Sequence, residues 1–368
     1  DEDEESEAVL EEESLLDIAR FKFPEVMLSY HYRSRYEELI AFSNAAFYGG
    51  RLNISPNPTP SAAPPITVHK VNGVWEDRVN RAEAEKVLSL LTAYLNEVEK
   101  LPQAERETLG VITFNAQQRD CILDMIDKKC DADADFKATY TAAVKRRSDG
   151  EDYGLFVKNI ENVQGDERDR IIFSFAYAHN AKGVMSRNFG WLNRPGGENR
   201  LNVAISRAKR RIDIVTSIIP SDLRVDDIKT TGVHILRKYL DYAYCISSGD
   251  RAGAEQVLNS FVDIGLPRTE AKSGGLADKL YAALVKRGAS VERNVGMGSY
   301  KLDVAVKNAK GEYAVGIECD DGLLEKDLKA RERDVMRKKF LESRGWKLLR
   351  VWSSEWYDDS EKVISDIL

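Results

Sequence analysis

Three acidic residues toward the C-terminus have the types and spacing of a metal site. Asp303 lies in the apolar run YKLDVAV, and Glu318 and Asp320 follow in GIECDD. Both runs are typical of strands, in which residues two apart point to the same side, so Glu318 and Asp320 share a face. Carboxylates from adjacent strands are the ligands that Mg²⁺ or Mn²⁺ prefers. A metal held there would activate water and stabilise a leaving oxyanion, so the sequence predicts phosphodiester hydrolysis by Asp303, Glu318 and Asp320.

A second candidate site centres on Arg207. The stretch 198–211, ENRLNVAISRAKRR, interleaves apolar and polar residues and is predicted to form a helix from a Gly-rich turn to a basic cluster. An arginine projected from a packed helix suits contact with a phosphate held by a neighbouring domain. Taken alone, the stretch is better explained as a surface amphipathic helix.

Strands alternating with helices are expected to position Arg207. The pattern predicts a parallel sheet covered on both faces, the α/β class. The expected strands are 66–71, 109–113, 155–159, 170–176 and 212–217, and the expected helices include 80–100, 116–128 and 233–245. Residues 131–153 are polar and rich in Asp and Ala, and are expected to be a mobile insertion.

Unusual polar residues are expected at the carboxyl ends of these strands, where such sheets bind ligands. Thr113 to Gln118 follows one strand, and residues 162–169 form a turn before another. Gly165 suits a tight turn and close approach of a ligand. Gln164 and Glu167 are placed to hydrogen-bond a ribose or a phosphate-bound network.

The acidic residues 303, 318 and 320 are expected in a separate unit. From residue 275 the pattern reads helix, three strands, a long basic helix from about residue 325 to 344, and a last strand at 346–352. This αβββαβ order is that of restriction-endonuclease-like folds.

Composition is compatible with a nucleic-acid partner. The net charge is −7, but residues 1–20 hold ten acids and one arginine, so the other 348 residues carry +2. The four cysteines are scattered without a metal-ligand spacing, which fits a cytoplasmic protein, and no apolar run predicts a membrane span.

Four blocks then carry a family resemblance. HYRSR (31–35), GVITFNAQQ (110–118), NVQGDERDRIIFS (162–174) and RLNVAISRAKRR (200–211) occur in the order of the second RecA-like domain of superfamily 1 helicases of the nonsense-mediated-decay type. The stretch 28–52 is similar to large bacterial helicases that end in a nuclease-like domain. The resemblance implies an ATP-dependent motor acting on DNA, single- or double-stranded.

The resemblance also implies roles for individual residues. Tyr32 would stack on adenine, and Arg33 and Arg207 would contact the γ-phosphate and neutralise charge during phosphoryl transfer. The remaining assignments are two sets: Gln164, Gly165 and Glu167 would bind nucleotide and couple it to the strand groove, and Thr113 and Gln117 would bind nucleic acid. Core packing for Tyr32 and a surface ion pair for Glu167 are the structural alternatives.

One part of the motor is absent from the printed sequence. No GxxxxGK[ST] phosphate loop occurs, and no acidic strand-end motif precedes Leu28. The chain thus resembles the C-terminal part of a longer helicase, in which ATP is bound only together with a first RecA-like domain at the N-terminal side. That domain of the same protein is the expected partner.

The tail resembles very-short-patch-repair-type endonuclease domains, of the PD-(D/E)xK kind, with departures. LDVAV, IECDD, ARERD and GWKLLRVWSSEW match in order, and Arg331 and Arg337 on the basic helix are candidate phosphate contacts. Relatives usually read E-C-D-G with a histidine five residues after the Asp, where this chain has Asp321 and Glu325. The lysine of the common D…ExK pattern is also replaced, by Asp320.

The domain hypothesis follows. Residues 1–20 are an acidic head or linker, 21–246 the second RecA-like domain, 247–273 a linker or docking element, and 274–368 the nuclease domain. Two other functions stay open: a nucleic-acid-binding module with a degenerate, inactive nuclease, and an RNA-directed helicase. A solvated basic face is the alternative for the long helix.

Overall fold

The structure is a computed structural model that describes most of the chain. The described residues are 19, 22–24, 27–148, 150–186, 188–225, 230–261, 275–297, 301–320 and 335–368. No helix among them is long and apolar enough to span a membrane. The predicted acidic head lies almost entirely outside the described residues, as does much of the predicted linker and the first part of the predicted basic helix.

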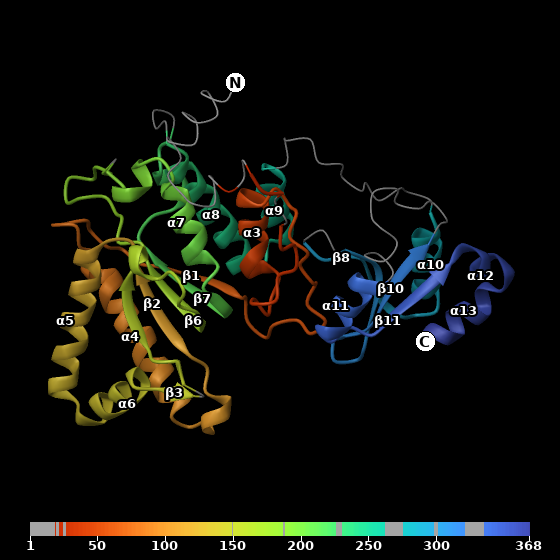
Figure 1. The fold of residues 1–368 in the computed structure, drawn as a ribbon, viewed down its shortest axis with the longest axis horizontal. Coiled ribbons are helices and arrows are strands. Elements are labelled where there is room, and N and C mark those ends of the chain that lie inside the picture. Colours follow the sequence, from red (N-terminus) through yellow and green to blue (C-terminus); the bar gives the residue numbers. More distant parts are fainter. Residues whose placement is uncertain are drawn as a thin grey trace. The chain divides into compact units, whose positions relative to one another are not determined.

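A five-stranded parallel sheet forms the larger domain (Figure 1). The strands stand in the order β1-β7-β6-β2-β5, and their bounds are Ile66–Lys70, Ala208–Thr216, Arg168–Ser174, Leu109–Thr113 and Phe156–Asn159. All four pairings are parallel. The expected α/β class and strand positions are therefore confirmed.

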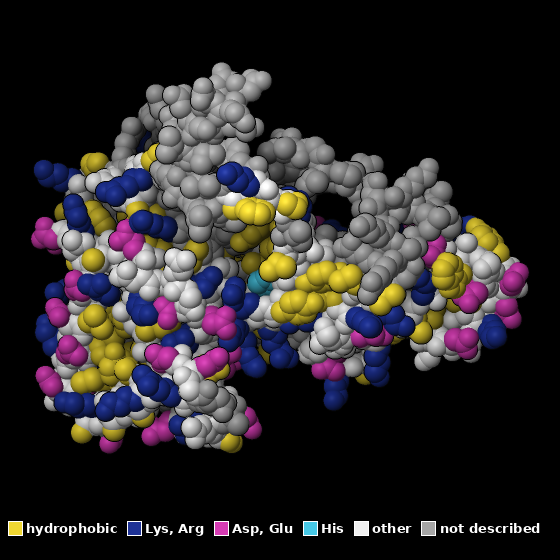
Figure 2. All heavy atoms as spheres, in the orientation of Figure 1, with side chains coloured by type: hydrophobic (Ala, Val, Ile, Leu, Met, Phe, Trp, Pro, Cys, Tyr) yellow, Lys and Arg dark blue, Asp and Glu magenta, His cyan; other side chains and the backbone are white. Residues whose placement is uncertain are grey.

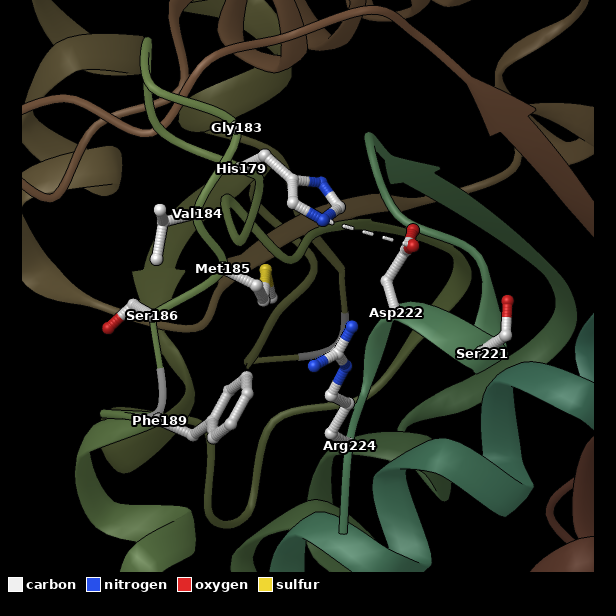
Figure 3. Close-up of a pocket in the computed structure, with 9 residues that line it drawn as sticks. All are labelled: His179, Gly183, Val184, Met185, Ser186, Phe189, Ser221, Asp222 and Arg224. Atoms are coloured by element: carbon white, nitrogen blue, oxygen red, sulfur yellow. Dashed lines mark ion pairs between the residues drawn. The ribbon is translucent and has the colours of Figure 1, made fainter.

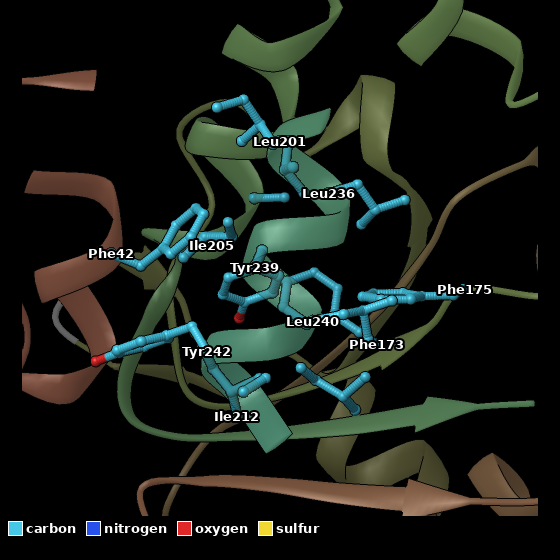
Figure 4. Close-up of a cluster of buried hydrophobic side chains, with 14 of the residues drawn as sticks. Phe42, Phe173, Phe175, Leu201, Ile205, Ile212, Leu236, Tyr239, Leu240 and Tyr242 are labelled. Carbon is cyan, nitrogen blue, oxygen red and sulfur yellow. The ribbon is translucent and has the colours of Figure 1, made fainter. Parts of the chain in front are cut away.

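Helices cover both faces because alternate strand residues are apolar on each side. On one face, α3 (Glu38–Phe47), α7 (Gly197–Ile205) and α8 (Thr231–Ser248) pack with Phe173, Ile212 and Ile214. Figure 4 shows Tyr239 and Tyr242 of α8 among these side chains.

On the other face, α4 (Arg81–Val98) and α5 (Ala116–Ala132) pack with the intervening strand residues. Those include Val111, Ile172 and Val215, each fully buried. The sheet is thus held from both sides and can fix residues at either edge.

Residues 131–153 are ordered, so the expectation of a mobile insertion is wrong. They form α6 (Ala134–Val144) and the short hairpin β3–β4 (Arg147–Ser148 and Glu151–Asp152), apart from residue 149, which lies outside the description. Asp133 caps the helix by accepting the Phe136 N–H at 2.9 Å. Phe136 is buried against the α4–α5 side, and this single anchor is easily missed in a polar stretch.

The predicted helix over residues 198–211 is shorter than expected. Helix α7 ends at Ile205, and β7 begins at Ala208. Lys209, Arg210 and Arg211 are therefore strand residues, and Arg207 lies in the turn between the two elements. Ala208 and Ile212 are buried and pair with the sheet, which favours the extended backbone.

The smaller domain has a mixed four-stranded sheet in the order β11-β10-β9-β8. The strands are Leu348–Trp352, Tyr313–Asp320, Leu302–Lys307 and Ser290–Val295; β10 and β11 are parallel and the other pairs antiparallel. Helices α10 (Leu276–Lys286), α11 (Arg337–Ser343), α12 (Ser353–Asp358) and α13 (Ser360–Ile367) complete it. The predicted αβββαβ order is present.

The predicted linker begins with a docked helix. Helix α9 (Arg251–Asn259) packs on α8 through Ala254 and Leu258, which join the buried cluster of the larger domain. The first part of residues 247–273 therefore packs against the larger domain, and residues 262–274 lie outside the description.

Candidate nucleotide and nucleic-acid sites

Arg33 and Lys209 converge on one carboxylate, that of Glu167. Arg33 Nε donates to Glu167 Oε2 at 2.7 Å, and Lys209 Nζ lies 2.6 Å from Oε1. Burial raises the Glu167 pKa, but the hydrogen bonds from Lys209 and Arg33 outweigh it and hold the pKa below its ordinary value. Two sequence blocks 134 residues apart therefore meet in one cationic cluster.

Arg207 lies beside this cluster and is half-buried. Its Nε donates to the Val203 carbonyl at 2.8 Å, and its Nη1 donates to the Asp166 carbonyl at 3.3 Å. Burial lowers its pKa, and the positive charge of Arg33 lowers it further. Two guanidinium groups held close together with partial desolvation form a site that favours an added anion.

The cluster occupies the opposite edge of the sheet from the one expected. Glu167 immediately precedes β6 and Arg207 immediately precedes β7, so both lie at the amino ends of their strands. The expectation that the turn at 162–169 gathers at the carboxyl ends is wrong. The connection from β5 to β6 must return to the amino edge, since the strands are parallel.

The turn itself has the predicted backbone. Gly165 has a φ of +87°, in the left-handed region that favours glycine. Gln164 and Gly165 are exposed, and so is Tyr32, at 60%. These groups are accessible to a ligand.

Thr113 does not have the exposure that a phosphate contact needs. It is fully buried at the end of β2, and its hydroxyl donates to the Asn115 carbonyl at 2.8 Å. Direct contact with nucleic acid is therefore excluded in this conformation. Gln117 is exposed on the first turn of α5 and stays a candidate contact.

A buried polar network at the carboxyl edge of the sheet was not predicted from the sequence. Glu83 is fully buried and accepts hydrogen bonds from the Ala176 N–H at 2.7 Å, the Ser174 hydroxyl at 2.9 Å and the Ser217 N–H at 2.9 Å. Burial raises its pKa to about 7 against these bonds. A glutamate in a helix is normally expected at the surface, so its residue type does not predict burial. The only sequence signal for the burial of Glu83 is its position beside the buried helix residues 84, 87 and 91.

The carboxylates of the smaller domain do not form the predicted metal cage. Asp303 lies in β9, and Glu318 and Asp320 lie in β10, beside it. Asp303 Oδ2 accepts the Cys319 N–H at 2.8 Å. Within the described part of the chain, no three acidic, His or Cys side chains are grouped so that they could hold a metal ion.

Two arginines lie against the Glu318 carboxylate. Arg337 Nε of α11 lies 2.8 Å from Glu318 Oε1, and Arg350 Nη2 of β11 lies 3.8 Å from Oε2. Arg350 is the direct register partner of Glu318, so sheet pairing sets this contact. The described residues therefore do not fit Mg²⁺ or Mn²⁺. Arg331, predicted to touch phosphate, lies outside the described residues.

Comparison with known proteins identifies the larger domain. A family model described as an AAA domain matches residues 11–218, more than half of the chain. The chain belongs to this AAA-domain family. A second model, of restriction-endonuclease (REase) type, matches residues 277–368 of the AAA-domain protein. The resemblance to the C-terminal RecA-like part of superfamily 1 helicases, followed by an endonuclease-like domain, is thus confirmed.

Relatives of the AAA-domain protein are named as helicases. Uncharacterised ATP-dependent helicases of Mycoplasma genitalium and Mycoplasma pneumoniae are 33% and 31% identical over 93% and 90% of this chain, which covers 29% and 28% of their lengths. Another uncharacterised ATP-dependent helicase, from Methanocaldococcus jannaschii, is 25% identical over 53% of this chain, and the match covers 27% of the length of that helicase. The chain spans less than a third of these relatives.

The solved structures that match include the C-terminal domain of a possible DNA helicase from Lactobacillus plantarum, aligned over 53% of this chain and 94% of its own length at 18% identity and a TM-score of 0.26. A superposition of that quality carries no information about this fold.

Proposed function

We propose that this chain is the second motor domain of an ATP-dependent helicase, joined to a tail that binds nucleic acid. The observation that supports the motor most strongly is the cationic cluster of Arg33 and Lys209 on Glu167, with Arg207 beside it. Positive groups that meet a transferring γ-phosphate stabilise the charge that develops on its oxygens.

In this proposal the phosphate competes with Glu167 for Arg33. Glu167 is the anion that now holds Arg33 and Lys209, and a γ-phosphate presented by a first RecA-like domain would offer more acceptor oxygens. Arg207 would approach the same phosphate, and the exposed Tyr32 would stack on the adenine. ATP is therefore expected to bind only at the junction with that first domain.

Strand-stimulated ATP hydrolysis tests the motor. The helicase that contains this chain together with a phosphate-loop domain is expected to hydrolyse ATP faster in the presence of single-stranded DNA. The 368-residue chain alone is expected not to hydrolyse ATP. Robust hydrolysis by the isolated chain would overturn the proposal that its site is completed by another domain.

DNA is proposed as the substrate because the tail resembles domains that cut DNA. Competition of unlabelled RNA against labelled DNA of the same sequence, at one stated salt concentration, measures the preference. Stronger competition by RNA would favour the RNA-directed alternative.

For the tail, one observation favours binding over cleavage. Glu318 is neutralised by Arg337 and Arg350, and the described carboxylates do not form a metal cage. The 368-residue chain is therefore expected to bind DNA without cutting it in Mg²⁺ or Mn²⁺. An Asp303→Ala/Glu318→Ala double variant is the control, and cutting that the double variant abolishes would restore the nuclease hypothesis.

A further inference from the structure

A cavity of about 360 Å³ lies at the carboxyl edge of the parallel sheet. Its walls come from the loop after β6, which includes His179, Met185 and Phe189, and from the turn after β7, which includes Asp222 and Arg224 (Figure 3). Its volume falls within the range of about 300–1,000 Å³ usual for ligand sites. Open α/β sheets bind ligands at this edge.

The side of the cavity formed by Phe189 is fixed in place. Phe189 is buried at 2% exposure, and its ring packs edge-on against Tyr177 at 5.0 Å. The Tyr177 hydroxyl donates to the Phe189 carbonyl at 3.0 Å, and the Asn193 side chain accepts the Phe189 N–H at 2.7 Å. Because the Phe189 ring is almost wholly buried, it holds this side of the cavity rigid, and the half-buried Met185 offers the apolar surface that a ligand can reach.

The walls are ordered by local hydrogen bonds. Asn180 Oδ1 accepts the N–H groups of Lys182 and Val184 at 2.9 and 3.0 Å, which closes the turn that carries Met185. On the other side, Asp222 Oδ2 accepts the Ile219 N–H at 2.9 Å. Asp222 is thus engaged in capping its own turn, and its other oxygen lies 4.0 Å from His179 Nε2.

Arg224 is the side chain that offers a binding group. Figure 3 shows its guanidinium projecting into the space bounded by His179, Met185 and Phe189. With the residues that the structure describes, it makes no hydrogen bond or ion pair. A guanidinium beside the Met185 side chain matches a ligand with a phosphate and a flat ring, because the phosphate accepts hydrogen bonds from the guanidinium and the ring packs on Met185.

We infer that this cavity binds one nucleotide unit of single-stranded nucleic acid, with Arg224 on the phosphate and the base against Met185. The inference rests on the proposed motor function and names a strand subsite within it. The predicted contact at Gln117 follows β2 at the same sheet edge. The strand-binding path therefore extends across the ends of β2, β6 and β7.

Binding of a fluorescein-labelled oligothymidylate to the 368-residue chain tests the subsite. Arg224→Ala is expected to weaken binding by about 10-fold, and Arg224→Lys to restore part of the loss. The slope of log affinity against log salt concentration should become shallower by about 0.7 in Arg224→Ala, since one phosphate contact is lost. Lys128→Ala, an equal charge change on the exposed part of α5, is the matched control and is expected to bind as the wild type does.

The possible outcomes distinguish failure of the proposed subsite from failure of the proposed motor function. Wild-type affinity and salt slope in Arg224→Ala would overturn the subsite while leaving strand binding by the chain intact. An equal loss in Lys128→Ala would also overturn it, since the effect would then be one of overall charge. Competition by free thymidine monophosphate as strong as by the oligomer, per nucleotide, would reassign the cavity to mononucleotides. No binding by the wild-type chain would overturn both proposals.

Discussion

Neighbouring arginines in one sequence block differ sharply in their surroundings. Arg207 is half-buried and hydrogen-bonded to main-chain carbonyls beside Arg33. Arg210 is exposed and faces Glu107 at 3.4 Å and Asp169 at 3.5 Å. The desolvated guanidinium can stabilise developing charge far better than one screened by water.

Arg207→Ala is expected to lower the kcat of ATP hydrolysis about 10³-fold or more in the helicase that contains this chain, as loss of an arginine finger does. Arg210→Ala is the control and is expected to stay near the wild-type rate, because an exposed ion pair contributes only about 0–1 kcal/mol. Steady-state phosphate release measures both. A wild-type rate for Arg207→Ala would remove Arg207 from the reaction.

Arg337 forms an ion pair with Glu318 and so competes with any cation for this carboxylate. Arg337→Ala is expected to raise the affinity of the chain for Mn²⁺ by roughly 10-fold, because removing one partner of a partly buried ion pair leaves the Glu318 carboxylate uncompensated and open to another cation. Calorimetric titration with Mn²⁺ measures it. Lys338→Ala on the same helix, where Lys338 lies 3.8 Å from Glu342, should leave Mn²⁺ binding unchanged. An unaltered affinity in Arg337→Ala would contradict neutralisation as the reason why a metal does not fit.

At the scale of elements, buried polar groups connect helices to the sheet. Glu83 of α4 accepts hydrogen bonds at the ends of β6 and β7, and Gln118 of α5 donates to the Ser174 hydroxyl at 3.0 Å. These bonds fix the two helices at the carboxyl edge, where the loops that form the cavity begin. Each lost partner would leave a buried donor or acceptor unsatisfied.

Glu83 should make stability depend on pH in a defined window. Its pKa is about 7 in the folded protein and has an ordinary value of 4.5, so the folded state binds more protons between these values. The contribution of Glu83 to the free energy of unfolding is therefore fully present below pH 4.5 and is lost as the pH rises through 7. The Glu83→Gln variant is expected to be less stable by about 1–3 kcal/mol, because the NH₂ group of its amide would face the donors that Glu83 now accepts from. The variant is also expected to lack this pH dependence.

Urea unfolding at a series of pH values measures the effect as the difference in free energy of unfolding between the wild-type protein and Glu83→Gln. Glu85→Gln, at an exposed position of the same helix, is the control and should keep the wild-type profile. Parallel pH profiles for wild type and Glu83→Gln would show that Glu83 does not titrate in this range.

At the scale of the whole molecule, charge is divided unevenly along the chain. Residues 1–20 carry −9, and the other 348 residues carry +2. On the face drawn in Figure 2, Lys and Arg side chains are scattered among acidic ones and do not form one continuous stripe. Affinity for nucleic acid is expected to be sensitive to the negative charge of residues 1–20, because like charges repel the phosphate backbone.

Removing residues 1–20 is expected to raise the affinity for oligothymidylate several-fold at low salt, because their charge repels the phosphate backbone. The gain should disappear near 1 M salt, where the Debye length falls to about 3 Å. Fluorescence anisotropy at several salt concentrations measures it, and a variant with the ten acids of this segment replaced by amides should behave like the truncated chain. Equal affinity with and without the segment at low salt would show that its charge does not act on binding.

The sequence by itself determined the fold class and the order of elements. Alternating apolar runs predicted the strands, because each strand buries residues on both faces of the sheet, and the blocks around Arg33, Glu167 and Arg207 indicated the family. Local pattern could not reveal that Phe136 anchors a helix or that Glu83 is buried, since each depends on partners distant in the chain.

Tertiary structure alone decided which side chains meet. It brought Arg33 and Arg207 together at the amino edge, and it buried Thr113 at the opposite edge. It also set Arg350 beside Glu318 through strand register and Arg337 against it from α11, which the spacing of three carboxylates did not predict. Residue spacing determines on which face of a strand a side chain lies. The charged groups that contact that side chain belong to neighbouring elements, and the tertiary structure determines which elements those are.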